Sequence, residues 1–197
     1  MKENLNAARA FFYAALAQLF IYGAAKKTPN ETIALLGGIL DAGFDKEAAN
    51  AAKNLKNSLE NGGFETLDEE FSELFMSPFG AKIAMSASVY YDGLEAGKPL
   101  VAVKEAMNIA ALRKDKFAEH EDNFGFVFLL MSKLCKSDEN ALFIAAGKVY
   151  AEVLAPYSAK FLAAVIANPK ATIYKDAARL AERFLAFERE FYASLGR

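Results

Sequence analysis

The residues with the clearest capacity for chemistry form one acidic run, Glu119-His120-Glu121-Asp122, which Asn123 follows. Carboxylates beside an imidazole can transfer protons or ligate a hard cation. Carboxylates can also anchor a cationic ligand such as a guanidinium group. A purely structural role is the simplest interpretation, because acidic side chains stabilise a helix N-terminus and an apolar run begins at Phe124. The spacing alone leaves all three roles standing.

Composition removes several other kinds of chemistry. The 197 residues include one His and one Cys, which excludes a zinc site built from several such ligands. No glycine-rich phosphate loop is present, so no motif indicates phosphate binding, and no nucleophile-elbow motif indicates an α/β-hydrolase. With 23 Lys+Arg against 25 Asp+Glu, the net charge is −2, and the chain lacks the basic stripe of a nucleic-acid-binding protein.

The elements that must position these residues are predicted to be helices. Apolar residues recur at steps of three and four, most clearly at Ile173, Ala177, Leu180, Phe184, Phe187 and Phe191. The sequence predicts an all-α fold of about eight or more helices in a single domain over residues 1–197. Helices are expected at about 5–22, 30–41, 45–60, 66–75, 100–112, 124–131, 139–154, 156–168 and 173–191. An irregular loop is expected at about 77–97.

Local signals refine this picture. Asp45 is expected to cap one helix, and Thr66 with Glu69 to form a capping box for the next. Pro156 should lie in the first turn of a new helix. Cys135 lies in an apolar run, which fits a reduced core thiol in a reducing compartment.

The first apolar segment, 10–25, superficially resembles a secretory signal. Glu3 stands in the would-be basic region, and polar residues such as Gln18 interrupt the apolar stretch. The segment is also shorter than the roughly 20 residues of a comfortable membrane span. We therefore expect a buried amphipathic helix, without stable membrane insertion, in a cytoplasmic protein.

Aromatic residues frame the expected loop on both sides, at Phe71, Phe75, Phe79, Tyr90 and Tyr91. They could simply form core. They could also line an apolar groove for a partner, and Tyr90 and Tyr91 would point in different directions in an extended segment.

Several segments resemble, in order, those of the TorD/DmsD/NarJ family of molybdoenzyme-maturation chaperones. The acidic run with Asn123 is similar to the family's "E-x-x-D-H" signature, although Asn123 stands where most members have His. Matching segments elsewhere are Leu16-Ala17-Gln18-Leu19-Phe20, Leu74-Phe75-Met76-Ser77-Pro78, Ser88-Val89-Tyr90-Tyr91-Asp92, Leu154-Ala155-Pro156-Tyr157 with Phe161-Leu162, and Ile173-Tyr174. The resemblance covers essentially the whole chain.

The resemblance implies a cytoplasmic, non-enzymatic chaperone that needs no cofactor. Its partners would be the twin-arginine signal peptide and the apo form of a molybdopterin-containing oxidoreductase. Because such a signal has two adjacent arginines followed by an apolar stretch, its receptor needs carboxylates beside an apolar groove. We expect Glu119 and Asp122 to anchor the arginines beside Asn123, with Asp92 a further candidate. The expected apolar wall consists of Phe71, Phe75, Phe79 and Tyr90.

Two alternatives stay open. A helical scaffold or regulatory protein would bind a folded partner and ignore an isolated signal peptide. A metal-dependent enzyme would use Glu119, Glu121 and Asp122 as oxygen ligands. The sequence is compatible with a monomer or with a domain-swapped dimer.

Overall fold

Every regular element in the described part of the chain is helical. The computed structural model describes residues 2–76, 83–94, 96–113, 120–137 and 139–195, and no strand occurs within these ranges. A single isolated bridge pairs Ser86 with Asn123 there. The prediction of an all-α fold is confirmed.

The chain divides into two compact units. Unit 1 consists of Met1–Ala17 and Met85–Ser158, and unit 2 of Gln18–Ala84 and Ala159–Arg197. Helix α1 (Lys2–Phe20) and helix α10 (Ala155–Ala167) supply residues to both units. The expectation of a single domain stays a prediction.

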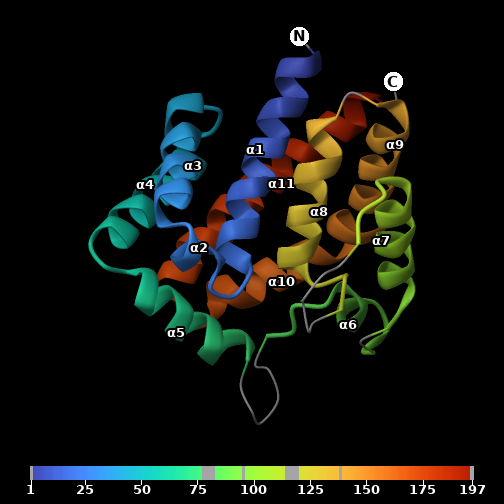
Figure 1. The fold of residues 1–197 in the computed structure, drawn as a ribbon. Helices are drawn as coiled ribbons and strands as arrows, with labels where there is room; N and C mark the ends of the chain where they lie inside the picture. Colours follow the sequence, from blue (N-terminus) through green and yellow to red (C-terminus); the bar gives the residue numbers. More distant parts are fainter. Residues whose placement is uncertain (1, 77–82, 95, 114–119, 138, 196–197) are drawn as a thin grey trace. The chain divides into compact units, whose positions relative to one another are not determined.

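Unit 1 is organised around the apolar run that begins at Phe124. This run forms helix α8 (Phe124–Lys136). Both α8 and α7 (Lys98–Ile109) pack against α9 (Asn140–Val149) (Figure 1). Phe124 and Phe128 are fully buried, and the Phe128 ring lies 6.3 Å from that of Tyr13 of α1. The prediction of a central buried helix is therefore confirmed. The further helices of unit 1 are α6 (Ala87–Asp92), α7 (Lys98–Ile109), α8 (Phe124–Lys136) and α9 (Asn140–Val149).

A π-helical turn joins α9 to α10. Residues Tyr150–Leu154 form this turn, and Pro156 lies in the first turn of α10, as expected. Proline has no N–H to donate to the carbonyl of Glu152, and its ring would clash with that carbonyl in a regular α-helix. A widened turn relieves the clash, so the helix continues where the sequence predicted a break.

In unit 2, helix α4 (Lys46–Glu60) packs against α3 (Pro29–Ala42) and α11 (Ile173–Leu195). Asp45 caps α4, as predicted, by accepting a hydrogen bond of 2.9 Å from the backbone N–H of Ala48. The same carboxylate pairs with Arg183 of α11 at 2.7 Å, and this guanidinium holds the pKa of Asp45 below its usual value. The helices of unit 2 are α2 (Ala24–Lys27), α3 (Pro29–Ala42), α4 (Lys46–Glu60), α5 (Phe64–Phe75) and α11 (Ile173–Leu195).

The predicted capping box at Thr66 is wrong. Helix α5 begins earlier, at Phe64, and no side chain caps it. Gly63 turns the chain so tightly that an added Cβ would lie 2.5 Å from the carbonyl oxygen of Ser58. This close approach, which glycine permits, lets α5 start directly after α4 and leaves Thr66 inside the first turn.

Part of the stretch expected to be irregular is helical. Residues 77–82 and 95 lie outside the described residues, but Ala87–Asp92 form α6. Six residues are too few to make a stable helix by themselves. Helix α6 packs against α7, and its first turn is held by hydrogen bonds to the acidic run.

Candidate functional site

Asp122, the aspartate of the acidic run, is fully buried in unit 1. Its Oδ2 atom accepts a hydrogen bond of 2.8 Å from the backbone N–H of Ser88 and one of 2.9 Å from Ser86 Oγ. Ser86 and Ser88 occupy the N-cap and second positions of α6. Asp122 therefore caps a helix that lies more than thirty residues away in the chain.

Backbone hydrogen bonds reinforce this attachment. The N–H of Ala87 donates to the carbonyl of Asp122 at 3.0 Å, and the N–H of Phe124 donates to the carbonyl of Met85 at 2.9 Å. The segment before α6 and the segment before α8 thus run antiparallel for a few residues. Two motifs that are far apart in the sequence form one local structure.

Asn123, rather than Asp122, caps the buried helix α8. Its side-chain oxygen accepts a hydrogen bond of 3.0 Å from the backbone N–H of Gly125. Asparagine is among the best N-cap residues, whereas a histidine at this position would offer no comparable short acceptor. The residue that departs from the family pattern therefore has a structural role of its own in this chain.

The rest of the acidic run lies nearer the surface. His120 is exposed, and Glu121 is half-buried with its carboxylate 3.9 Å from Lys104 Nζ. Glu119 lies outside the described residues. Among the residues that the structure does describe, no three His, Cys, Asp or Glu side chains form a metal-binding group.

Helix α6 carries two further predicted residues, Tyr90 and Asp92. The Tyr90 ring is half-buried and lies 6.0 Å from that of Phe124, and burial raises the pKa of its phenol to about 12. Asp92 is exposed at the end of the helix. The structure thus places Tyr90 and Asp92 on the helix that Asp122 caps, with Asp92 at its far end, and Asn123 opposite Ser86 at the start of that helix.

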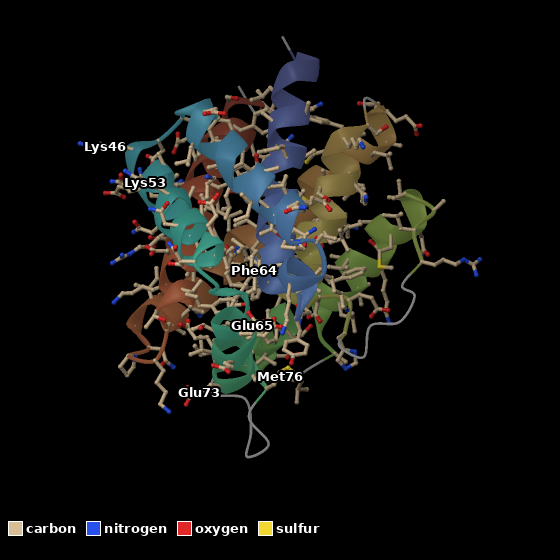
Figure 2. All side chains as sticks on the ribbon, turned by 60° about the vertical axis from the view of Figure 1, so that its left-hand side comes forward. Lys46, Lys53, Phe64, Glu65, Glu73 and Met76 are labelled. Carbon is tan, nitrogen blue, oxygen red and sulfur yellow. The ribbon has the colours of Figure 1, made fainter. Side chains whose placement is uncertain are left out.

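The described residues of the predicted aromatic wall do not all belong to one unit, because Tyr90 lies in unit 1 and Phe71 and Phe75 lie in unit 2. Phe71 and Phe75 are buried in unit 2, with rings 4.9 Å apart, and both face Tyr174. Phe79 lies outside the described residues. The large apolar side chains left exposed beside this cluster are Tyr22, whose ring lies 5.4 Å from Phe71, and Met76 at the end of α5 (Figure 2).

Sequence reasoning missed Glu70, which organises the start of α11. Its carboxylate accepts hydrogen bonds of 3.0–3.1 Å from the backbone N–H groups of Thr172, Ile173 and Tyr174, and one from the Thr172 hydroxyl. Tyr174 in turn donates its hydroxyl to the Leu19 carbonyl at 2.6 Å. Glu70 looks like an ordinary surface residue of an amphipathic helix, so no local signal could have identified it.

Sequence reasoning also missed Ser86 and Ser88 as partners of Asp122. Ser88 did stand in a segment that resembles the family, as did Asp122. The only signal in the sequence for this contact was that both segments, the one with Ser88 and the one with Asp122, resemble the same family.

These features define a helical protein whose acidic signature organises a neighbouring helix. The model of the nitrate reductase delta subunit family matches residues 41–164, which is more than half of the chain. The chain therefore belongs to this family of NarJ/TorD-type chaperones. No curated protein matches the sequence.

Family membership establishes the general role. The family consists of maturation chaperones for molybdoenzymes rather than of catalysts, and its members bind molybdoenzyme precursors in the cytoplasm. Among the described residues, one helical stretch, Asn140–Ala167, is long and apolar enough to qualify as a membrane span. Buried core helices meet the same criterion, and 44% of the qualifying window is buried.

Proposed function

We propose that this chain binds the twin-arginine signal peptide of a molybdopterin-containing oxidoreductase in the cytoplasm. It holds the apo-enzyme until the cofactor is inserted, and so delays export. The observation that carries this proposal is the Asp122 carboxylate, which joins the two family-like segments of unit 1 through Ser86 and Ser88. Membership of the chaperone family supports the same conclusion.

The signal chemistry sets what its receptor must supply. Two adjacent guanidinium groups require carboxylates, and the apolar stretch behind them requires exposed apolar surface. Near α6, Asp92 is an exposed carboxylate and Leu94 is 66% exposed. The acidic run adds the half-buried Glu121, although its carboxylate already lies 3.9 Å from Lys104 Nζ.

The direct arginine contacts of Glu119 and Asp122 stay predictions, as do the roles of Asn123 and Tyr90 and the aromatic wall of Phe71, Phe75 and Phe79. Because Asp122 is buried with one oxygen occupied by Ser86 and Ser88, a second role is favoured for it. It holds α6 in place, and α6 carries the residues that the signal meets.

A titration tests the proposed function. The full chain is mixed with a fluorescent twin-arginine peptide from a molybdoenzyme of the same genome, and with a matched Lys-Lys peptide. We expect saturable binding of the first and about tenfold weaker binding of the second, since lysine lacks the planar, bidentate donor geometry of arginine. Absence of binding to all such signals would refute the proposal and favour a scaffold that recognises a folded client.

A further inference from the structure

The end of α6 presents an exposed aromatic surface in unit 1. The Tyr91 side chain is 49% exposed, and its ring lies 6.2 Å from that of Tyr157 at an angle of 73°. Leu94, which follows α6, is the most exposed large apolar side chain of the described residues. An aromatic pair with a neighbouring exposed leucine forms a surface suited to a partner rather than to the core.

A carboxylate adjoins the same ring. A Cβ added to Gly97 would lie 3.1 Å from Cδ1 of Tyr91 and 3.2 Å from Oδ2 of Asp92. The Tyr91 ring and the Asp92 carboxylate therefore both lie against the backbone of Gly97. The absence of a side chain at this position lets the two groups converge.

The Asp92 carboxylate has no positive partner in the described part of the chain. Its Oδ1 atom accepts a hydrogen bond of 3.0 Å from the backbone N–H of Leu94, and neither a lysine nor an arginine of the described residues forms an ion pair with it. Two other carboxylates of unit 1 do have a lysine partner: Glu105 pairs with Lys148, and Glu121 lies 3.9 Å from Lys104 Nζ. An uncompensated negative charge next to an exposed ring is complementary to a cation.

We propose that Tyr91, Asp92 and Tyr157 form a binding subsite for an arginine side chain of the client peptide. A guanidinium stacks on an aromatic face and at the same time donates parallel hydrogen bonds to a carboxylate. An ammonium is a compact point charge that cannot do both in one plane, so this subsite selects arginine over lysine. The inference rests on the proposed function and adds the residues that read the arginine.

The test repeats the peptide titration with variants of the full chain. Asp92→Asn keeps the shape of the side chain and an acceptor for Leu94, but removes the charge. Tyr91→Ala removes the ring. Each should weaken binding of the Arg-Arg peptide by about three- to tenfold, and Tyr91→Ala should also reduce the preference over the Lys-Lys peptide.

A gain of affinity separates recognition from simple damage. Tryptophan is the best cation–π partner, so Tyr91→Trp should bind the Arg-Arg peptide about twofold more tightly. Asp41→Asn, at an exposed aspartate near the end of α3, makes the same charge change elsewhere and should retain the wild-type affinity. Circular dichroism confirms that each variant is folded.

The possible failures are distinguishable. If the wild-type chain binds no twin-arginine peptide, the proposed function itself is wrong. If the wild type binds with a preference for arginine while Asp92→Asn and Tyr91→Ala keep its affinity, the subsite is wrong and the proposed function stands. An equal loss in Asp41→Asn would reduce the effect to overall charge and overturn the subsite.

Discussion

At the scale of single residues, Asp122 belongs to the acidic run that resembles the family signature, and it also holds the start of α6. Its Oδ2 atom accepts two hydrogen bonds from the start of α6, while its Oδ1 atom is buried without a hydrogen-bond partner in the described part of the chain. Burying a carboxylate costs free energy that only its hydrogen bonds offset. The residue is therefore sensitive to any change in its surroundings, and its replacement should affect α6 directly.

Replacing Asp122 tests how it acts on the signal. Asp122→Ala leaves the Ser88 N–H buried without an acceptor, which should cost about 1–3 kcal/mol of unfolding free energy. It should also weaken binding of the twin-arginine peptide at least about tenfold. Thermal melts and peptide titrations measure the two effects.

Asp122→Asn distinguishes a direct role from a positioning role. The amide keeps an oxygen acceptor for the start of α6 but carries no charge. If Asp122 holds α6, this variant keeps most of the affinity. A tenfold loss of binding at unchanged melting temperature would instead assign Asp122 to direct contact with an arginine.

At the scale of elements, long-range carboxylates start two of the helices. Asp122 caps the six-residue helix α6, and Glu70 of α5 caps the 23-residue helix α11. The first N–H groups of a helix have no partner within it, so an acceptor from another element both satisfies them and fixes where the helix begins. These carboxylates tie the helices to their neighbours.

The cap on α11 should be measurable. Glu70→Gln replaces one acceptor oxygen by an NH₂ group that faces backbone donors, so it should cost about 1–3 kcal/mol and lower the melting temperature by about 2–4 °C per kcal/mol. Glu69→Gln, at the exposed neighbour, is the matched control and should melt like the wild type. Equal melting temperatures for both variants would show that Glu70 contributes no net stability.

At the scale of the whole molecule, the question is how the two compact units unfold. Residues of α1 and α10 belong to both units, and the chain passes from one to the other after positions 17, 84 and 158. If one unit unfolded alone, α1 and α10 would each have to break at the boundary between the units. We therefore expect the chain to unfold as a single domain.

Differential scanning calorimetry tests this expectation. A single transition should appear, with equal calorimetric and van't Hoff enthalpies. At about 0.7 kcal/mol per residue, the enthalpy at the midpoint should be about 140 kcal/mol for the 197 residues. Two resolved transitions would contradict the single-domain prediction and assign separate stabilities to the units.

The sequence by itself determined the helical class, most helix positions and the family. Apolar spacing along Ile173–Leu195 and the apolar run at Phe124 are local patterns that specify a helix and its buried face. Asp45 was recognisable as a cap because its partner, Ala48, lies three residues away. Such features depend on neighbours in the chain, which a sequence displays.

Only the tertiary structure decided what the acidic run and the glutamates do. The partners of Asp122 lie 34 and 36 residues away, and those of Glu70 lie more than 100 residues away. Tyr91, Asp92 and Tyr157 likewise come together across a long separation in sequence. A hydrogen bond depends on the distance between its donor and acceptor atoms in space. For residues this far apart in the chain, the sequence spacing does not predict that distance.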